Sequence, residues 1–520
     1  MKERDKEINK GLKSLVKSSV IVLMAFILSK IFGYLYRIII ARYFGPEGYG
    51  LFSLSIVIVG WFVAISSLGF VEGMVRYISF YRGKNELDKI KYIYRFSSRI
   101  LFVSTLITAL ILFFTSNFIS VSIFHNPDLS FYVKIFSIML PFWVFSTYFL
   151  SIMRAFEKVK EVSFIESILQ SFSKLLFLVF FIFLGFKTNA IIFSFFLGIL
   201  IMFLLAYFYC KIKLPKIFLN YKLDAETKRE TSKNFFSYSW PVLFFGIISS
   251  IFYWVDSLSI GFFKSATEVG LYNAVIPIAL LFNIAPEIFL QLFFPMITRK
   301  YSLNDLDFIK ETSKQIGKWV FMINLPLFIL MIFFPGMIIN ILFGQKYLIA
   351  ANSLRFLVFG ALFASVFIIS NNLISMIGKS KIIFYDIIIA TLINIILNII
   401  LIPQPVIFGM DNSLGINGAS IATTISIIIF NTLFLIQARH YTTIVPTKLD
   451  NFKIFFAALI SFVLLILLKN ITVITIFSFI LLTIFFLLSY ILLLFLFKAF
   501  DEKDIMIFET FKRKIKSYKS

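Results

Sequence analysis

An uncharged apolar run near the carboxyl end of the chain, TVITIFSFILLTIFFLLSYILLLFLF at residues 472–497, decides the fold class. About 20 helical residues, each rising 1.5 Å, cross the hydrocarbon layer of a bilayer, so this run predicts a transmembrane helix. Similar runs fill most of the 520 residues, of which 60% are apolar and only 15% are charged. Soluble domains carry about 25% charged residues. The sequence therefore predicts an all-α polytopic membrane protein.

Fourteen apolar runs of this kind predict about fourteen transmembrane helices. We place them at about 16–41, 49–71, 99–121, 131–153, 162–185, 189–210, 238–262, 270–294, 319–342, 353–377, 382–402, 415–437, 452–468 and 472–497. Positively charged residues should gather in the cytoplasmic loops. With a cytoplasmic amino terminus, the inside segments hold about 40 of the 50 Lys and Arg residues and the outside loops about five. Both termini of this multi-pass protein are therefore predicted on the cytoplasmic side of the cell membrane.

Several function classes are disfavoured by composition. The net charge of +23 is spread over short loops and helix ends, which indicates membrane topology and no nucleic-acid partner. Cys210 is the single cysteine, and His125 and His440 are the only histidines, so neither a disulfide nor a histidine-based metal site is expected. Gly378-Lys379-Ser380 ends like a phosphate-binding loop, but Leu373 stands where that loop needs a glycine. No catalytic residues are predicted.

The longest hydrophilic stretch divides the chain into two lobes. The predicted parts are an amino-terminal lobe of six helices, a cytoplasmic linker, a second six-helix lobe, two extra helices and a basic cytoplasmic tail, at residues 1–210, 211–237, 238–437, 438–497 and 498–520. A weak internal repeat supports this division. Gly50-Leu51-Phe52 is followed 220 positions later by Gly270-Leu271-Tyr272, and Lys134-Ile135-Phe136 is followed 221 positions later by Arg355-Phe356-Leu357. Repeated halves with a substrate site between them are a common transporter plan.

Local motifs carry a resemblance to a known family. The stretch IIARYFGPEGYGLF at 39–52 resembles the hairpin after the first helix of polysaccharide and O-antigen flippases, and SLGF at 67–70 resembles the end of their second helix. Later landmarks, VGLY at 269–272, LFG at 342–344 and the segment from Asn398 to Pro403, follow in the family order. The resemblance spans nearly the whole chain. It implies the multidrug/oligosaccharidyl-lipid/polysaccharide exporter superfamily, whose two six-helix lobes form a V, often with two additional helices.

Charged residues within the first-lobe helices indicate a substrate site. Lys30 and Arg37 lie seven residues apart, and thus on nearly the same helix face, while Gln170 and Lys174 belong to a polar stripe on the fifth helix. An ionisable side chain in a membrane helix is costly and usually faces a cavity or a partner. A cationic cavity suits a lipid-linked phosphate. The alternatives are that Arg37 extends to the interface and that the lysines pair with Glu166.

A different set of polar residues marks the second lobe. Asp256, Asn394, Asn398 and Thr423 offer carboxylate, amide and hydroxyl oxygens at similar depth, the groups that bind Na⁺, and a carboxylate could instead carry a proton. Some relatives in the superfamily are cation-coupled through this lobe, so the resemblance points the same way. Hydrogen bonds across helix contacts would also explain the Asn and Thr residues. Glu287 is an alternative cation or proton site. No other cofactor is expected.

The resemblance and the cationic cavity together predict a flippase. Its cargo would be a polyprenyl- or dolichyl-(pyro)phosphate-linked oligosaccharide, moved across the cytoplasmic membrane by alternating access for cell-surface polysaccharide or glycan synthesis. Its partners would be that lipid-linked oligosaccharide, membrane lipids and the glycosyltransferases or polymerase of the pathway. The alternatives are a cation-coupled multidrug exporter of the same superfamily, a membrane glycan ligase or polymerase, which the short outside loops disfavour, and a non-transporting scaffold. The glycan, the lipid carrier, the coupling ion and the oligomeric state stay open.

Overall fold

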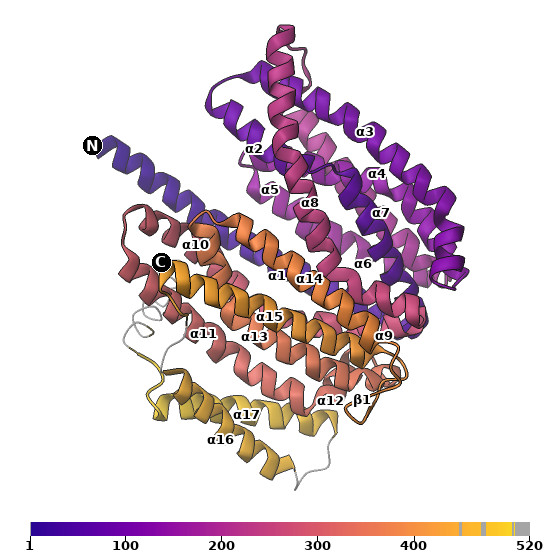
Figure 1. The fold of residues 1–520 in the computed structure, drawn as a ribbon, viewed down its shortest axis with the longest axis vertical. Helices are drawn as coiled ribbons and strands as arrows, with labels where there is room; N and C mark the ends of the chain where they lie inside the picture. The colour runs from indigo at the N-terminus through magenta and orange to yellow at the C-terminus, as the bar shows by residue number, and fades with distance from the viewer. Residues whose placement is uncertain (1, 447–449, 470–474, 502–503, 505–520) are drawn as a thin grey trace. The chain divides into compact units, whose positions relative to one another are not determined.

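Helices make up nearly all of the computed structural model, which describes residues 2–446, 450–469, 475–501 and 504 (Figure 1). Within these residues, thirteen helical segments are long and apolar enough to cross a membrane, which confirms the all-α polytopic prediction. The first segment, Ile27–Ser66, holds the first two expected helices, so the prediction of about fourteen counts it as two. The exact number of crossings stays a prediction.

The first half of the chain contributes seven α-helices and shorter helical pieces. They are α1 (Lys2–Ser66), α2 (Phe70–Gly83), α3 (Leu87–Asn117), η1 (Phe118–Ile123), α4 (Asp128–Ala155), α5 (Val159–Ser163), η2 (Phe164–Leu169), α6 (Gln170–Phe183), α7 (Asn189–Lys213) and η3 (Pro215–Phe218). Each long helix follows one of the apolar runs, because a backbone in hydrocarbon must satisfy its hydrogen bonds within its own helix.

The second half begins with α8, whose first turn is capped by the Asp224 carboxylate, which accepts from Thr227 N at 2.8 Å. Its elements are α8 (Ala225–Phe263), α9 (Ala266–Leu280), η4 (Leu281–Asn283), α10 (Ile284–Ser302), α11 (Leu306–Phe333), α12 (Pro335–Leu342), η5 (Gln345–Ala350), α13 (Ala351–Met376), α14 (Ser380–Leu401), α15 (Ile416–Thr442), α16 (Asp450–Lys469) and α17 (Ile476–Leu496). A short antiparallel hairpin, in which β1 (Val406–Ile407) pairs with β2 (Met410–Asp411), lies between α14 and α15.

The chain divides into two compact units. Unit 1 comprises Met1–Ala274 and Thr391–Ala419, and unit 2 comprises Val275–Ala390 and Ser420–Ser520. The boundary between the units does not coincide with the predicted linker at 211–237. Unit 1 contains α8 and the second part of α14 in addition to the helices of the first half. The lobe and linker boundaries therefore stay predictions.

The helix α1 turns back on itself at Gly45. Its φ of 73° and ψ of −177° are outside the helical range, and Pro46 follows directly. The rings of Tyr36 and Phe52 are 5.9 Å apart, although 16 residues of unbroken helix would separate them by about 24 Å. The two parts of α1 therefore lie side by side and antiparallel, which accounts for two expected helices within one segment.

Helix boundaries repeat at the offset found in the sequence. Helix α3 with η1 ends at Ile123 and α12 ends at Leu342, while α5 to α6 cover Val159–Phe183 and α14 covers Ser380–Leu401. Each pair agrees to within about two residues after a shift of 220, which is the usual uncertainty of helix ends. The helix order thus supports a parallel duplication over most of the chain.

Two repeat-related glycines contact each other in unit 1. A Cβ atom on Gly50 would lie 1.6 Å from the carbonyl oxygen of Ala266, and one on Gly270 would lie 1.9 Å from the carbonyl oxygen of Pro46. Ala266 follows Pro46 by the same 220 positions that separate the glycines. The contact is therefore reciprocal, as in an interface about a twofold axis. Only glycine at both positions allows the backbones of α1 and α9 to approach this closely.

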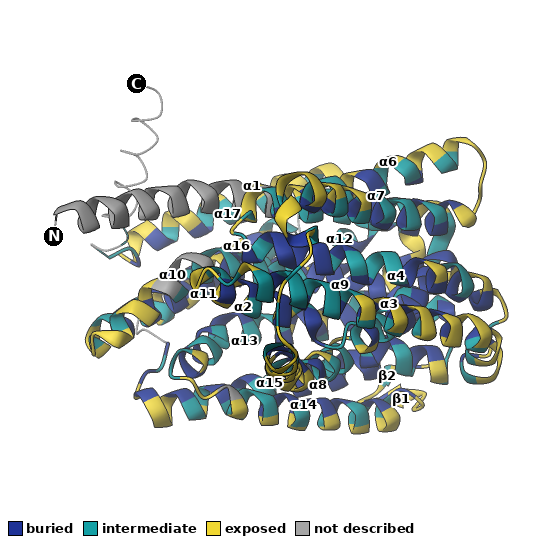
Figure 2. Ribbon diagram, turned by 90° about the horizontal axis from the view of Figure 1, so that it is seen from above, coloured by how far each residue is buried: buried dark blue, intermediate teal, exposed yellow. Residues whose placement is uncertain are grey.

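Unit 2 contains the two carboxyl-terminal helices. The helices α16 and α17 pack with α11 around a buried cluster that includes Leu325, Leu465, Phe486 and Tyr490. Their outer faces stay apolar and exposed. The same holds for one face of α14, which runs through both units and on which Tyr385, Ile396 and Ile399 are 53–62% exposed. Exposed positions recur along α14 in Figure 2. Apolar side chains on an outer surface are expected where lipid replaces water.

Candidate functional site

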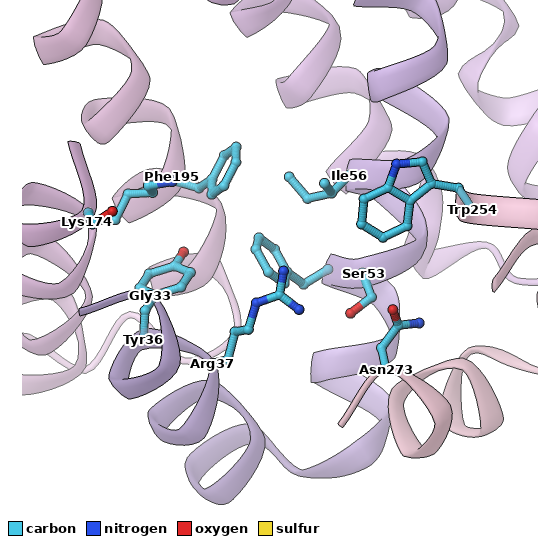
Figure 3. Close-up of a pocket in the computed structure, with 11 residues that line it drawn as sticks. Gly33, Tyr36, Arg37, Ser53, Ile56, Lys174, Phe195, Trp254 and Asn273 are labelled. Carbon is cyan, nitrogen blue, oxygen red and sulfur yellow. The ribbon is translucent and has the colours of Figure 1, made fainter. Parts of the chain in front are cut away.

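A cavity of about 180 Å³, lined by both polar and apolar side chains, lies within unit 1 (Figure 3). Five helices supply its walls, namely α1, α6, α7, α8 and α9. The lining residues are Gly33, Tyr36, Arg37, Phe52, Ser53, Ile56, Ser171, Lys174, Phe195, Trp254 and Asn273. Two of them are cationic and none is acidic, so the cavity favours an anion.

Lys174 enters the cavity from α6 across a glycine of α7. A Cβ atom on Gly198 would lie 2.3 Å from Cγ of Lys174, so the absence of a side chain there makes room for the lysine stem. The Lys174 ammonium lies 4.6 Å from the centre of the Phe195 ring, within the range of a cation–π contact. Glu166 is bonded to Arg154 instead, so the alternative of a Lys174–Glu166 ion pair is wrong.

Arg37 is held by a chain of hydrogen bonds that crosses from α1 to α9. Its guanidinium donates to the Tyr49 hydroxyl at 3.4 Å, and that hydroxyl donates to the main-chain carbonyl oxygen of Asn273 at 3.2 Å. The side-chain amide of Asn273 donates to Ser257 Oγ at 2.9 Å. Arg37 therefore keeps most of its five donors for a ligand, and the alternative that it extends to the membrane interface is not what the structure shows.

Two of the four predicted substrate residues line the cavity. Arg37 and Lys174 do, while Lys30 and Gln170 are not among the lining residues. Gln170 lies one turn before Lys174, at the start of α6. Their role in substrate binding stays a prediction.

The sequence reasoning missed the residues that the second half contributes. Trp254 and Asn273 come from α8 and α9, which were expected to belong to the other lobe. One signal was present: Asn273 follows the lining residue Ser53 by 220 positions. Ser53 and Asn273 lie one helical turn after Gly50 and Gly270, the two glycines in contact. The repeat could therefore have indicated that both residues line the same cavity.

The predicted ion-coupling residues Asp256, Asn394 and Asn398 form a hydrogen-bonded cluster in unit 1. The Asn398 amide donates to Asp256 Oδ1 at 2.7 Å and also to Asn394 Oδ1. The Tyr272 hydroxyl, which the sequence reasoning missed, donates to Asp256 Oδ2 at 2.8 Å. Asn398 Oδ1 is buried without a hydrogen-bond partner. Thr423, the fourth predicted residue, belongs to unit 2, so the complete set stays a prediction.

The cavity and the cluster occupy matching places in the two halves. Asp256 follows Tyr36 by 220 positions, Tyr272 follows Phe52, and Asn394 follows Lys174. The Tyr36 and Phe52 rings are in contact, as are Tyr272 and Asp256. Tyr36 and Lys174 of the first half thus correspond to a carboxylate and an amide in the second. Among the described residues, no group of three or more His, Cys, Asp or Glu side chains could hold a metal.

Known proteins resemble this chain in sequence. It is 26% identical over 352 residues to a putative O-antigen transporter of Shigella flexneri, covering 66% of this chain and 80% of that protein. It is 25% identical over 240 residues to the probable low-salt glycan biosynthesis flippase Agl15 of Haloferax volcanii, covering 45% and 48%.

Solved transporter structures share the fold. The lipid II flippase MurJ, in an inward closed conformation, matches with a TM-score of 0.71 and 18% identity over 91% of this chain and 98% of that one. An inward-facing multidrug resistance MATE family transporter matches with a TM-score of 0.62 and 16% identity over 82% and 98%. The model of the polysaccharide biosynthesis protein family matches residues 15–301. With more than half of its length matched, the chain belongs to the polysaccharide biosynthesis protein family.

Proposed function

We propose that this protein is a flippase that moves a polyprenyl- or dolichyl-(pyro)phosphate-linked oligosaccharide across the cytoplasmic membrane by alternating access. The observation that carries the proposal is the cavity of unit 1, which Arg37 and Lys174 line and to which no acidic side chain contributes. The family assignment and the relatives named as an O-antigen transporter and a glycan flippase support it.

In this proposal the two cations hold the phosphate group. An arginine and a lysine give charge-assisted hydrogen bonds to phosphate oxygens, which offset part of the cost of removing the phosphate from water. Ser53 offers a hydroxyl group and Asn273 its side-chain carbonyl oxygen to the first sugar, and Phe195 and Trp254 offer ring faces. Lys30 and Gln170 would meet the substrate on its way into the cavity. No covalent bond is made or broken, so the protein would be a transporter and not an enzyme.

A multidrug exporter is the second candidate, since MATE transporters share this fold. The charges in the cavity argue against it for cationic drugs, because Arg37 and Lys174 would repel them. Fold similarity at 16% identity does not distinguish the two functions.

We further propose that the cluster around Asp256 binds the coupling ion, Na⁺ or H⁺. The unpartnered Asn398 Oδ1 next to the Asp256 carboxylate supports this proposal, because buried acceptors without a donor are costly unless a cation approaches them. In the same proposal, the protein lies in the cytoplasmic membrane with both termini on the cytoplasmic side. It would associate there with glycosyltransferases or a polymerase of the pathway.

Charge changes at Lys174 test the substrate class. In a strain that lacks its own flippase, Lys174→Gln should reduce surface glycan at least about tenfold, the equivalent of losing one charge-assisted bond of ~1.5–3 kcal/mol. Lys174→Arg should restore part of the transport and Lys174→Glu none, at equal protein levels in the membrane.

The matched control is Lys187→Asn, which removes an exposed lysine that does not line the cavity. Its backbone φ is 47°, a conformation that asparagine tolerates. Transport should stay at the wild-type level in this control. Normal transport by Lys174→Glu would reject the cationic cavity and favour the exporter or scaffold.

A further inference from the structure

A second buried carboxylate, Asp386 on α14, faces Gln437 on α15 within unit 2. The Gln437 amide nitrogen donates to Asp386 Oδ1 at 2.9 Å, and Asp386 is only 4% exposed. The other two oxygens of the pair, Asp386 Oδ2 and Gln437 Oε1, are both buried without a hydrogen-bond partner. Two unpaired acceptors in one buried contact are costly, so a donor is missing from this place.

A single proton would satisfy both oxygens. A protonated carboxyl group has one O–H donor, and a primary amide has a donor and an acceptor. With the proton on Oδ2, that hydroxyl donates to Gln437 Oε1 while the amide N–H donates to Oδ1, which closes a ring of two hydrogen bonds. A bound metal ion would need four or more ligands, and two unpaired oxygens are too few.

The internal repeat shows what is missing at Asp386. The residue 220 positions earlier is Glu166, another carboxylate, and Arg154 neutralises it through an ion pair. The residues 220 and 221 positions after Arg154 are Ile374 and Ser375, neither of which carries a charge. The second half therefore keeps the carboxylate but lacks its arginine.

The surrounding charges do not replace that arginine. Asp386 has no ion pair among the described residues, and three basic groups at this end of unit 2 have other neighbours, while Lys381 and Arg439 are exposed. Lys379 lies 3.8 Å from the Tyr441 ring centre, the His440 ring is 4.8 Å from the same ring, and Lys318 of α11 is bonded to Asp504. The remaining basic side chains near the pair along α14 and α15 are Lys381 and Arg439, and α13 has no charged residue after Arg355.

We propose that Asp386 and Gln437 form a proton-binding site in unit 2, separate from the Asp256 cluster. The proton takes the place that Arg154 fills in the first half, and separation of α14 from α15 at this contact would release it. The site depends on neither the identity of the cargo nor the ion bound at Asp256. Its failure and that of the proposed flippase function are therefore distinguishable.

Infrared spectroscopy of the full-length protein in lipid nanodiscs tests the proposal at neutral pH. A protonated carboxyl group absorbs at a carbonyl frequency well apart from that of a carboxylate, and Asp386→Asn should remove one such band. The variant should fold, because the new amide can donate to Gln437 Oε1 and accept from Gln437 Nε2. The matched control is Glu166→Gln, which should leave the carboxylic acid bands unchanged because the Glu166 carboxylate forms an ion pair with Arg154.

A second variant keeps the test decisive if Asp386→Asn fails to fold. Gln437→Leu removes the amide and should keep the carboxylic acid band but shift it to higher frequency, since the acid loses both of its hydrogen bonds. The proposal is overturned if Asp386→Asn removes a carboxylate band instead of an acid band. An acid band that Gln437→Leu leaves at the same frequency would equally reject the pair.

Discussion

At the scale of single residues, the two halves place different polar groups at equivalent positions. Tyr36 and Lys174 of the first half correspond to Asp256 and Asn394 of the second, and each set lies in its own polar site within unit 1. A duplication supplies two copies of a helix framework, and a few substitutions then change what each copy can bind. An anionic cargo and a coupling cation could thereby use two versions of one site.

Asp256→Asn tests the coupling site at this scale. The amide can still accept from Asn398, and the Tyr272 hydroxyl can turn to accept from the new NH₂ group, so the fold should persist. The loss of the negative charge should lower the dependence of transport on a Na⁺ or proton gradient at least about tenfold. The measurement is transport in proteoliposomes with an imposed gradient.

The control for this change is Tyr272→Phe, which removes one hydrogen bond to Asp256 but leaves the carboxylate. It should retain most of the gradient dependence. Equal dependence in the wild type and in Asp256→Asn would exclude Asp256 from coupling.

At the scale of helices, a buried ion pair fastens the chain after α17 to α11. Lys318 is fully buried and donates to Asp504 at 2.6 Å, and Trp319 Nε1 donates to the same carboxylate at 2.6 Å. Gln315 also donates to Asp504, and Asp501 lies 3.4 Å from Lys318. The sequence placed Lys318 in a cytoplasmic segment and the residues from 498 in a tail, and did not indicate that they meet.

Removal of one partner from this pair should destabilise unit 2. Asp504→Ala removes the nearer of the two carboxylates at the buried Lys318 ammonium and leaves only Asp501, at 3.4 Å. Loss of one partner of a buried ion pair typically costs about 3–5 kcal/mol, and Asp501 should offset part of that cost. Thermal unfolding in detergent should therefore occur at a clearly lower temperature than for the wild type. Lys318→Met combined with Asp504→Leu should recover most of the loss, because it removes the buried ammonium together with its nearest carboxylate.

An exposed pair on the same helix provides the comparison. Lys314 and Glu311 are 3.8 Å apart at the surface, so Glu311→Gln should change stability by less than about 1 kcal/mol. Equal effects of Asp504→Ala and Glu311→Gln would show that the buried pair does not hold the segment.

At the scale of the whole molecule, the topology rests on the distribution of basic residues and on the turn at Gly45. The turn lets α1 supply two antiparallel helices, which keeps the later loops on their expected sides. Reporter fusions after Lys233, Lys318 and Lys516 should report the cytoplasm, and fusions near Asn126, Gly344 and Asp411 should report the outside. One sustained reversal along the chain would reject the fourteen-helix topology.

The fold class, the approximate helix positions and two of the cavity residues follow from the amino-acid sequence alone. Long apolar runs must become helices in lipid, because no other segment can satisfy its backbone there. Arg37 and Lys174 were recognisable for a related reason, since charges in such helices are rare and costly. The repeat of Gly50 and Gly270 was also visible in the sequence, but the sequence did not show that these two glycines lie at the contact between α1 and α9.

Which polar groups meet, in contrast, depends on how the helices pack in three dimensions. This packing paired Glu166 with Arg154 instead of Lys174, brought Trp254 and Asn273 to the cavity of Arg37, and set Gln437 against Asp386. A hydropathy pattern gives the position of a residue along a helix but does not say which neighbouring helix it faces. That choice depends on close packing, as at Gly50 and Gly270, where missing side chains let two backbones touch and thereby place the residues one turn further on.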